Sequence, residues 1–588
     1  MSDRPWARFD DMRSGRALCF TGPRDVQVAW RVDEVVDVLA EVDRRTAAGA
    51  WAVGMVAYEA AGGLDPALTT RPPADGLPLA WFAVCAAPAA VAPVTPGDSR
   101  GWEWTPNWDG QRYGRAVAAV QARIAAGDTY QVNLTSRLRA PMGDDPERLY
   151  AQLAHAQRGA HHAYVDMGRF TIVGASPELF FEWTGDRVRM RPMKGTARRG
   201  RTLAEDRGVV AALRASSKER AENIMIVDLV RNDLARIART GSVSVTALCR
   251  PEQYETVHQL TSDVEARLLP GLGLVDVFRA TFPSGSVTGA PKASSMGIIA
   301  ELEDTPRGVY CGAVGFVAPP DAPVRARFSV AIRTVVADRE RGSAGYGTGG
   351  GVTWGSDPAA EHAEAVAKTA VLAARPAQFH LIETLRYEPG PGPLRLELHL
   401  RRMADSAAYF GFAFRADDAR AAVAEALRGH PAPARIRLTA HRDGRVAASV
   451  GPAPAVPAGP VRLALDPEPI DARECWPHHK TSRRAPYDAR LARHAADDVL
   501  LVNERGEVTE SCVANLAVLL DGRWWTPPVG SGCLPGVARG VLVAAGVLAE
   551  RTITPADLAA AERLALVNSL RGWRPAHLPG GTSGTFVR

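Results

Sequence analysis

Lysine is scarce in this chain, because only five of its 70 lysine and arginine residues are lysines. Arginine serves well for surface charge and for pairing with carboxylates, but its guanidinium stays protonated and is a poor amine nucleophile. A lysine kept against this bias is therefore a candidate for chemistry that needs a primary amine. Any one of them is equally well explained as a position that escaped the bias. The five are Lys194, Lys218, Lys292, Lys368 and Lys480.

Other absences narrow the class of protein. No apolar run approaches the roughly 18 residues of a membrane-spanning helix, and residues 1–6 lack the apolar segment of a secretory signal. The net charge of +5 is small, and no basic run is interleaved with aromatic residues. The seven cysteines lack Cys-x-x-Cys spacing, which favours reduced thiols over disulfides or a zinc site. We expect a cytoplasmic protein that binds neither nucleic acid nor membrane.

The length of 588 residues is too great for one core and predicts two to four domains. A new hydrophobic pattern begins after Arg375-Pro376, so the sequence predicts one domain over 1–374 and another over 375–588. The Pro- and Ala-rich residues 86–99 are typical of a connection. A second Pro-rich stretch, 452–460, would divide the second domain into two lobes.

Hydrophobic periodicity predicts several elements of the first domain. In the strand predicted over 326–337, apolar residues alternate with Ser329, Ala331 and Arg333, which places Arg333 on the face opposite the core. Asp357-Pro358 is typical of a helix start. The predicted helices cover 113–126, 205–240 (closed by Gly241) and 357–375, and a further strand covers 308–316.

Paired carboxylates suggest a metal site. Glu361, Glu364 and Lys368 would share one helix face, and Glu219 and Glu222 repeat the three-residue spacing in another helix. Two such pairs can hold Mg²⁺ through oxygen ligands and water, with substrate anions completing the shell. A solvated face with a Glu-to-Lys pair is, from spacing alone, the commoner explanation.

A glycine-rich segment, 345–351, lies between a predicted strand and a predicted helix. Its three consecutive glycines would let backbone N–H groups approach an anion in a loop, although a flexible turn would also use them. Residues 283–292 form a second loop of small residues. Together with Arg333 these loops would suit a small dicarboxylate bound beside Mg²⁺.

Six short segments between residues 128 and 315, taken in order, resemble the chorismate-utilising enzyme family, and the resemblance extends over about 110–372. The resemblance implies one large α+β domain with antiparallel sheets and a Mg²⁺-dependent chorismate site, in which Glu222 and Glu364 hold the metal and Glu219 and Glu361 support it. The segments are 128–134, 176–178, 221–223, 228–234, 289–292 and 311–315. The substrate-binding positions would be Thr288, Arg333, Tyr346, Gly349, Gly350, Gly351 and Lys368.

Lys194 distinguishes among members of that family. Anthranilate synthases resemble the segment 191–196 but carry alanine at this position, and lysine is the mark of aminodeoxychorismate synthases. The resemblance implies that the Lys194 amine adds to C2 of chorismate while the C4 hydroxyl leaves, with Glu178 as general acid. Ammonia then adds at C4 and the lysine departs. Lys194 must be partly neutral for this role, through desolvation or a neighbouring cation.

Gln131 indicates the nucleophile. Family members that use water carry a lysine base at the matching position, so ammonia is expected here. The sequence contains no glutaminase Cys/His/Glu unit, and we expect a separate glutamine amidotransferase subunit to supply the ammonia.

A second constellation surrounds Lys480. Residues 479–483 are a compact cationic cluster, Glu510 follows after thirty residues, and the turn 532–536 opens a predicted helix. A lysine for a Schiff base, a carboxylate for a pyridinium nitrogen and a helix N-terminus for a phosphate are the parts of a pyridoxal 5'-phosphate site. By themselves these parts do not establish a pyridoxal phosphate site.

Their order over about 379–560 resembles the fold-type IV pyridoxal phosphate enzymes, which include branched-chain aminotransferases and aminodeoxychorismate lyase. Residues 399–402 and 405–407 resemble the family's early phosphate motif. The resemblance implies a two-lobed domain in which Lys480 is the Schiff-base lysine and general acid/base and Glu510 the pyridinium partner. Many relatives carry threonine where Ala538 stands, which removes a phosphate-binding hydroxyl. The cofactor-binding positions would be Arg402, Lys480, Glu510, Asn515, Val537 and Ala538.

The two resemblances together predict a bifunctional enzyme that makes 4-aminobenzoate from chorismate, compatible with a homodimer through the second domain. Two alternatives stay open: the second domain is an aminotransferase, or it is an inactive structural or interaction module, an idea that rests on Ala538. Whether the product feeds folate or a secondary metabolite is also open.

Overall fold

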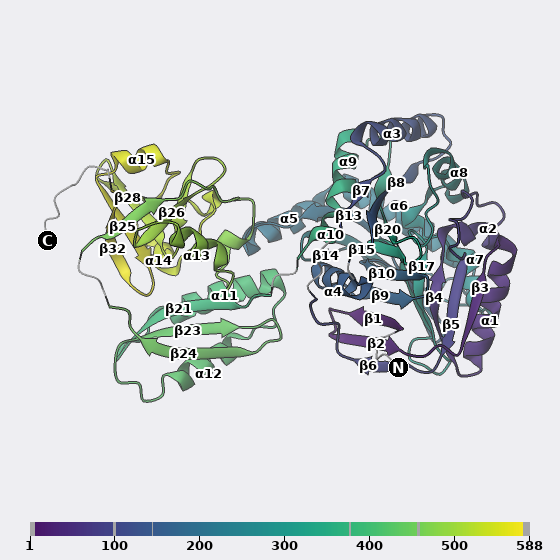
Figure 1. The fold of residues 1–588 in the computed structure, drawn as a ribbon, viewed down its shortest axis with the longest axis horizontal. Coiled ribbons are helices and arrows are strands. Elements are labelled where there is room, and N and C mark those ends of the chain that lie inside the picture. The colour runs from purple at the N-terminus through teal and green to yellow at the C-terminus, as the bar shows by residue number, and fades with distance from the viewer. Residues whose placement is uncertain (1–5, 98–101, 144, 376–377, 456–458, 580–588) are drawn as a thin grey trace. The chain divides into compact units, whose positions relative to one another are not determined.

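The computed structural model describes residues 6–97, 102–143, 145–375, 378–455 and 459–579. The chain divides into two compact units (Figure 1), and the division is not a single cut. The first unit is Met1–Arg198 with Val210–Pro376, and the second is Arg199–Val209 with Ala377–Arg588. The inserted segment Arg199–Val209 was not anticipated from the sequence. Residues 98–99 and 456–458 of the two predicted connections lie outside the described residues.

Two antiparallel sheets form the first unit, in agreement with the predicted α+β class. One sheet has the order β16-β8-β20-β19-β10-β9-β1-β2-β6, with β7 beside β8. Its strands are β1 (Ala7–Asp11), β2 (Arg16–Phe20), β6 (Ala89–Val91), β7 (Thr105–Pro106), β8 (Gln131–Pro141), β9 (His161–Asp166), β10 (Phe170–Ser176), β16 (Gly289–Ala290), β19 (Thr334–Asp338) and β20 (Ser343–Val352).

The other sheet has the order β13-β15-β12-β11-β18-β17-β4-β5-β3, with β14 beside β15. Its strands are β3 (Asp25–Ala29), β4 (Trp51–Val56), β5 (Ala80–Cys85), β11 (Leu179–Thr184), β12 (Arg187–Arg191), β13 (Met193–Arg198), β14 (Ser244–Gln253), β15 (Val257–Arg267), β17 (Ala313–Val317) and β18 (Ala326–Val330).

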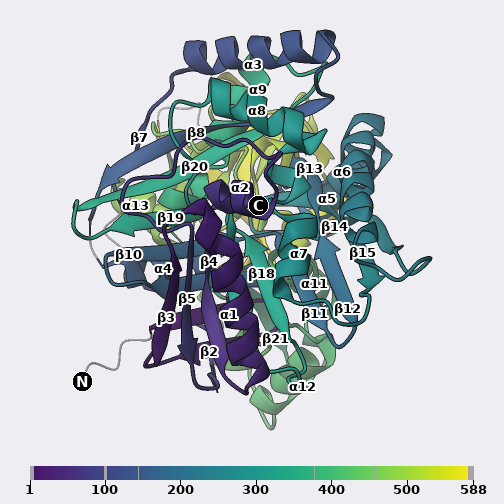
Figure 2. The ribbon, with the colours of Figure 1, turned by 90° about the vertical axis from the view of Figure 1, so that its right-hand side faces the viewer.

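Strand β4 shows why this second sheet is buried on both faces. Val53 and Met55 pack with residues of the first sheet, whereas Ala52 and Val56 pack toward helices, because successive side chains of a strand point to opposite faces. Figure 2 looks onto the helical side, where α1 lies beside β3, β4 and β5. The helices of this layer are α1 (Val35–Ala47), α2 (Ala61–Leu64), α6 (Ser217–Ala235) and α7 (Leu274–Thr281).

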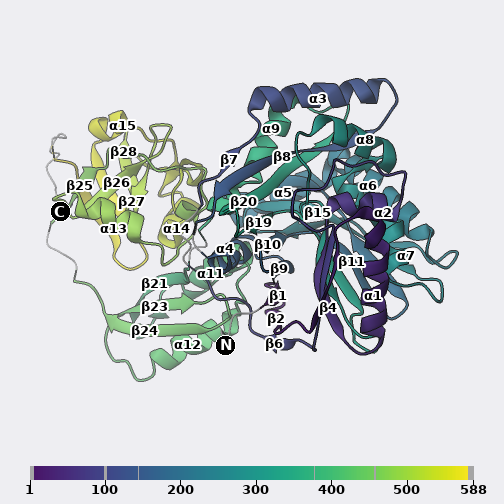
Figure 3. The ribbon, with the colours of Figure 1, turned by 45° about the vertical axis from the view of Figure 1, so that its right-hand side comes forward.

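Further helices cover the edge of the first sheet near β8 and β20 (Figure 3). Tyr113 and Val117 of helix α3 (Gly110–Ala125) pack with Leu134 of β8 and Val352 of β20. The remaining helices of this unit are α4 (Pro146–Gln157), α8 (Lys292–Leu302), α9 (Pro358–Ala367) and α10 (Ala370–Ala373). Helix α5 (Leu203–Ala215) begins in the inserted segment.

Three expectations about local structure are wrong. The helix predicted over 205–240 is two helices, because the Ser216 side chain caps α6 by accepting a hydrogen bond from the Glu219 N–H. The strand predicted over 326–337 breaks at Arg333, whose φ of 49° lies in the left-handed region, and the side chain lines a cavity. The strand predicted over 308–316 begins only at Ala313.

The prediction of a loop at the glycine-rich segment is also wrong. Residues 345–351 are not a loop but part of β20, which pairs with β8 along its whole length. A Cβ at Gly349 would lie 2.1 Å from the Leu134 carbonyl oxygen, so a side chain would prevent this close pairing. The predicted helix start at Asp357 is confirmed, since its side chain accepts a hydrogen bond from the Ala360 N–H.

The second unit has the expected two lobes, each built around its own sheet (Figure 1). The first lobe holds the sheet β22-β21-β23-β24, and the second holds β27-β26-β25-β32-β31-β28-β29-β30. The strands are β21 (Leu381–Glu388), β22 (Gly392–Pro393), β23 (Ala434–Ala440), β24 (Val446–Pro452), β25 (Val461–Leu465), β26 (Asp498–Val502), β27 (Val508–Ser511), β28 (Asn515–Leu520), β29 (Arg523–Thr526), β30 (Ala549–Glu550), β31 (Arg563–Asn568) and β32 (Gly572–His577). The helices are α11 (Leu396–Phe410), α12 (Ala416–Ala426), α13 (Ala485–Ala492), α14 (Val537–Ala544) and α15 (Pro555–Ala560).

Among the described residues, no helix combines the length and the apolarity needed to cross a membrane. All seven cysteines are free thiols.

Candidate active sites

A cavity in the first unit brings together almost every residue predicted for the chorismate site. Strands β13 and β20 and helices α6 and α9 supply most of its wall. Thr288 is the exception: it is fully buried, and its hydroxyl bonds the Ser284 and Gly285 carbonyls instead of facing the cavity. The predicted residues that line the cavity are Glu178, Lys194, Glu219, Glu222, Arg333, Tyr346, Gly349, Gly350, Gly351, Glu361, Glu364 and Lys368.

Lys194 lies on β13 with its amine inside this cavity. Burial lowers the pKa of its ammonium group, and the positive charge of Lys368 lowers it further, against the attraction of Glu222 and Glu364. A Cβ at Gly351 would lie only 2.5 Å from the Lys194 Nζ, so the absence of a side chain there makes room for the amine. The environment therefore favours the neutral, nucleophilic form.

Gln131 lies beside Lys194 at the start of β8. The same Cβ position at Gly351 is 2.1 Å from the Gln131 Nε2, so the amide and the amine are neighbours. Gln131 is buried, and neither of its amide atoms has a hydrogen-bond partner among the described residues. A buried amide without a partner is costly, so Gln131 is a candidate for contact with a bound molecule.

Glu178 is enclosed just before β11. Its Oε1 accepts a hydrogen bond from the Ser286 hydroxyl at 2.6 Å. Burial raises the pKa of this carboxyl to about 7, although Ser286 and Lys194 both oppose the rise. A carboxyl of this kind is protonated in part near neutral pH and can serve as a general acid. Ser286 belongs to the predicted small-residue loop, but the sequence assigned it no role.

Four carboxylates from two helices line the same cavity, Glu219 and Glu222 on α6 and Glu361 and Glu364 on α9. Burial raises the pKa of the first three, and a neighbouring carboxylate adds to the rise in each case. Glu364 is different: burial acts to raise its pKa, but Lys368 pairs with it at 2.8 Å, and this and nearby positive charges lower the pKa overall.

These oxygen donors are the ligand type that Mg²⁺ prefers, and a cation would relieve their mutual repulsion. The residues present therefore fit the metal chemically. Within the described ranges no group of three or more His, Cys, Asp or Glu side chains is drawn together closely enough to hold a metal ion.

Arg333 provides the positive charge at another part of the wall. It is enclosed, burial lowers its pKa, and its guanidinium donates to the Gln157 side-chain oxygen. No carboxylate of the described chain forms an ion pair with it, so a bound anion would compensate its buried charge. Tyr346 lies nearby in the cavity, with its hydroxyl donating to the Lys368 carbonyl at 3.2 Å.

A second cavity, in the second unit, is lined by all six residues predicted to bind a cofactor. Its further lining residues include His399 of the predicted phosphate motif, and Thr384, Arg437 and Arg484, which the sequence did not single out. The six predicted residues are Arg402, Lys480, Glu510, Asn515, Val537 and Ala538.

Lys480 is enclosed in this cavity. Burial lowers the pKa of its ammonium to about 8, and the nearby Arg402 charge contributes, against the attraction of Glu383 and Glu510. Its backbone is fixed as well, because the Ile382 N–H donates to the Lys480 carbonyl at 3.0 Å.

Glu510, at the end of β27, is a buried carboxylate without an ion pair among the described residues. It accepts hydrogen bonds from the Leu534 N–H at 3.1 Å and the Asn515 side-chain amide at 3.3 Å. Burial raises its pKa to about 8. A cationic ring nitrogen placed against Glu510 would stabilise its charged form.

Arg402 of α11 has most of its donors engaged. It forms a two-point ion pair with Glu383, at 2.8 and 2.6 Å, and also donates to the Pro535 carbonyl. His399 donates to the same carboxylate at 2.7 Å, and these partners hold the Glu383 pKa at about 2 despite its burial. Sequence reasoning missed Glu383, since only the fold brings β21 against α11.

Helix α14 begins beside the cavity at Val537, and its first N–H groups have no partner within the helix. The Ala538 methyl packs in an apolar cluster with Ala517 and Ala565. Backbone N–H groups are therefore the donors that this helix offers to a phosphate. Taken together, the lysine, the carboxylate and the helix start fit pyridoxal phosphate.

The family assignment follows from a match to a family model. The model described as chorismate binding enzyme covers residues 11–374, which is more than half of the chain. The chain belongs to this family. Residues 380–578 match the model described as amino-transferase class IV. Both models describe enzymes, so the chain is an enzyme with a chorismate-binding domain followed by a class IV aminotransferase-like domain.

Named relatives match the chorismate-binding domain. Anthranilate synthase component 1 of Streptomyces coelicolor is 41% identical over 290 residues, which are 48% of this chain and 56% of that protein. Aminodeoxychorismate synthase component 1 of Klebsiella aerogenes is 38% identical over 289 residues, 49% of this chain and 61% of that protein. The chain therefore spans little more than half the length of these relatives.

A solved structure supports the fold of this domain. The crystal structure of anthranilate synthase component I from Streptococcus pneumoniae superposes with a TM-score of 0.54 and 24% identity, covering 63% of this chain and 94% of that chain. At this identity the similarity concerns the fold alone.

Proposed function

We propose that this enzyme makes 4-aminobenzoate from chorismate in two steps, amination to 4-amino-4-deoxychorismate in the first unit and elimination of pyruvate in the second. Relatives named anthranilate synthase and relatives named aminodeoxychorismate synthase match the first domain at similar identity, so overall similarity does not decide between them. The observation that supports aminodeoxychorismate synthesis over anthranilate synthesis is Lys194, whose amine lines the cavity and has a lowered pKa.

In the first step the Lys194 Nζ forms a bond to C2 of chorismate, both ring double bonds shift, and the C4 hydroxyl leaves. Glu178, with a pKa of about 7, donates the proton that converts this hydroxyl to water. Ammonia then bonds C4, both ring double bonds shift back, and the bond to Lys194 breaks. The amine thus ends on C4, and Lys194 is regenerated.

The polar wall of the cavity suits this substrate. Arg333 would pair with a chorismate carboxylate, with Tyr346 and the backbone of Gly349–Gly351 alongside. Mg²⁺ held by Glu222 and Glu364, with support from Glu219 and Glu361, would neutralise a second carboxylate. Gln131 supports ammonia as the nucleophile, because an amide is a poor base for activating water.

The first unit has no assigned glutaminase site, and we infer that a separate glutamine amidotransferase subunit supplies ammonia. The name "component 1" of several relatives agrees with a second component. Free ammonium is expected to replace that subunit in vitro.

In the second unit, Lys480 would hold pyridoxal phosphate covalently, Glu510 would face its ring nitrogen, and Arg402 with the start of α14 would hold its phosphate. The bound cofactor would supply an electron sink for the elimination. Lys480, whose pKa of about 8 leaves part of it neutral, would move protons at its Nζ. Loss of pyruvate is favoured because the remaining ring becomes aromatic.

The decisive experiment incubates the purified protein with chorismate, ammonium, Mg²⁺ and pyridoxal phosphate, and measures 4-aminobenzoate and pyruvate. We expect the two products in equal amounts. Lys194→Ala is expected to abolish amination and with it both products, whereas Lys480→Ala should also release neither product but accumulate the aminated intermediate. Unchanged 4-amino-4-deoxychorismate formation by Lys194→Ala would exclude the nucleophile role.

The same assay separates the alternatives for the second unit. An aminotransferase would need an amino acceptor, so pyruvate release without an added keto acid would argue against it. An inactive module would not bind the cofactor. A visible absorption band of bound pyridoxal phosphate that disappears in Lys480→Ala would exclude that alternative.

A further inference from the structure

The segment Arg199–Val209 belongs to the second unit, although the chain places it within the first domain. It follows β13, the strand that carries Lys194, and the chain returns to the first unit at Val210. A stretch of eleven residues is thus taken from one catalytic domain and packed with the other. We refer to Arg199–Val209 as the inserted segment.

The start of the inserted segment is tightly fixed on α11. The Tyr409 hydroxyl donates to the Gly200 carbonyl at 2.7 Å, and Arg199 donates to the Tyr409 carbonyl at 2.7 Å. The Arg199 guanidinium also lies 4.2 Å from the centre of the Tyr409 ring and pairs with buried Asp206. A Cβ at Gly200 would lie 2.4 Å from the Asp206 backbone nitrogen, so this fold requires glycine.

His479, the residue before Lys480, is held between this segment and α11. Its Nε2 lies 3.0 Å from the Arg201 carbonyl and its Nδ1 lies 2.9 Å from the Ser406 hydroxyl. A carbonyl can only accept, so Nε2 carries the proton and Nδ1 accepts from Ser406. Burial lowers the His479 pKa to about 4, which keeps the ring neutral in this tautomer. The inserted segment therefore fixes the ring next to Lys480.

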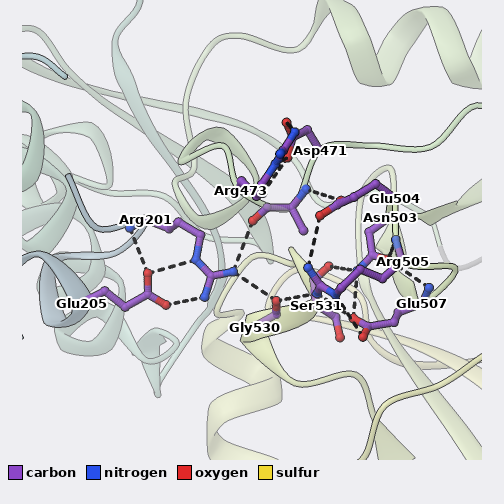
Figure 4. Close-up of polar contacts among 11 residues, drawn as sticks. Arg201, Glu205, Asp471, Arg473, Asn503, Glu504, Arg505, Glu507, Gly530 and Ser531 are labelled. Carbon is purple, nitrogen blue, oxygen red and sulfur yellow. Dashed lines mark hydrogen bonds and ion pairs between the residues drawn. The ribbon is translucent and has the colours of Figure 1, made fainter. Parts of the chain in front are cut away.

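Arg201 contacts two further backbone carbonyls of the second unit (Figure 4). Its guanidinium donates to the Ala472 carbonyl at 3.3 Å and the Gly530 carbonyl at 3.2 Å, while Glu205 holds it from behind. Gly530 lies in the turn that leads to Leu534, which donates to Glu510, and on to α14. One short segment thus contacts both the residue before Lys480 and the turn before the proposed phosphate site.

We propose that the inserted segment is a positioning element of the second active site, acting through His479 on Lys480 and through Arg201 on the turn at Gly530. This inference rests on the proposed cofactor role of Lys480. It makes the second reaction depend on residues encoded inside the first domain. The chain cannot then be divided at residue 375 without removing part of the second site's support.

The test uses the full chain and two matched pairs of variants. His479→Gln places an amide nitrogen near the Nε2 position and retains the bond to Arg201, whereas His479→Asn reaches only toward Ser406. Arg201→Ala removes the contact with Gly530. Arg473→Ala is its control, because Arg473 pairs with Asp471 beside Ala472 and is largely exposed.

For each protein the pyridoxal phosphate retained after gel filtration, the pH titration of its absorption and the kcat and KM of each half-reaction are measured. We expect His479→Asn and Arg201→Ala to weaken cofactor retention about tenfold and to shift the titration midpoint. The kcat for pyruvate release should fall with little change in KM. His479→Gln and Arg473→Ala should behave like the wild type, and chorismate amination should be unchanged throughout.

Two results would overturn the inference. One is a wild-type titration midpoint and kcat in both His479→Asn and Arg201→Ala; the other is an equal loss of both half-reactions, which would indicate general destabilisation. If His479→Asn fails to fold, the comparison of Arg201→Ala with Arg473→Ala still tests whether the inserted segment positions the second active site. Failure of the proposed function looks different, since the wild type itself would then bind no cofactor or release no pyruvate.

Discussion

Lys194 and Lys480 share two features of their environment. Both amines are enclosed in a cavity, burial is the largest cause of the lowered pKa of each, and a neighbouring cation adds to it. Lys292 instead forms a buried ion pair with Asp233, and Lys368 pairs with Glu364. A buried amine without a tight carboxylate partner loses its proton more readily than one held in an ion pair.

Gly351 tests how closely Lys194 is positioned. Gly351→Ala would place a Cβ 2.5 Å from the Lys194 Nζ and 2.1 Å from the Gln131 amide, so both side chains must move. We expect chorismate amination to fall by about a hundredfold, since small displacements of a reacting group have effects of this size. Gly345→Ala is the control, because it lies in the same strand with nothing within 4 Å of the added methyl. Equal activity of the two variants would show that Lys194 tolerates displacement.

Glu178 predicts the pH dependence of amination. Its pKa is raised to about 7, so the carboxyl is protonated below this pH and loses its proton above it. As a general acid it is active in the protonated form, and kcat/KM for amination should fall as the pH rises through about 7. Glu178→Gln should remove this descending limb along with most of the activity. A wild-type profile that rises over this range would show that Glu178 acts in its ionised form.

At the scale of elements, helices α6 and α8 are joined by a buried charge pair. Lys292, the first residue of α8, donates to Asp233 of α6 at 2.9 Å and to the Thr281 carbonyl at the end of α7. Both side chains are largely excluded from water, at 13% and 6% exposure, so neither charge can be left alone without a large cost.

Lys292→Met should lower the free energy of unfolding by about 3 kcal/mol at neutral pH, because the Asp233 carboxylate stays buried without its partner. Burial already raises the Asp233 pKa. A carboxyl with a raised folded-state pKa costs stability as the pH rises, so the loss should shrink toward acidic pH, where Asp233 is protonated. Urea unfolding of the single variant and of Lys292→Met/Asp233→Asn measures this. A double variant no more stable than the single one would contradict it.

At the scale of the whole molecule, each cavity is lined by residues of one unit only. Under the proposed function, each reaction would take its cavity side chains from one unit. An intermediate released from the first unit should then be a substrate for the second unit of another molecule.

Mixing Lys194→Ala with Lys480→Ala protein tests this independence. We expect 4-aminobenzoate to form after a lag while free 4-amino-4-deoxychorismate accumulates, with a final rate close to that of the slower half-reaction. Each variant alone should make none. If the mixture stays inactive although both proteins retain their intact half-reaction, the intermediate does not pass through solution.

The sequence alone determined the fold class. Apart from Thr288, the site residues that it predicted all line one of the two cavities, because they lie in short segments with recognisable local chemistry. The two-lobed second unit and the helix start at Asp357 were also predicted correctly. Predictions from local patterns were wrong where strands distant in sequence pair. Residues 345–351 form a strand because they pair with β8. The left-handed backbone at Arg333 interrupts the predicted strand, and the Arg333 side chain lines a cavity.

Only the tertiary structure decided which groups act on one another. The Ser286 bond to Glu178, the Glu383 partner of Arg402 and the unpaired amide of Gln131 each join residues far apart in sequence or depend on burial. The inserted segment is the longest stretch that the sequence did not place, because no pattern in residues 199–209 indicates that they pack with the second unit. Burial and long-range contacts determine the pKa values and the positions of these side chains, and neither burial nor a long-range contact can be read from a short stretch of sequence.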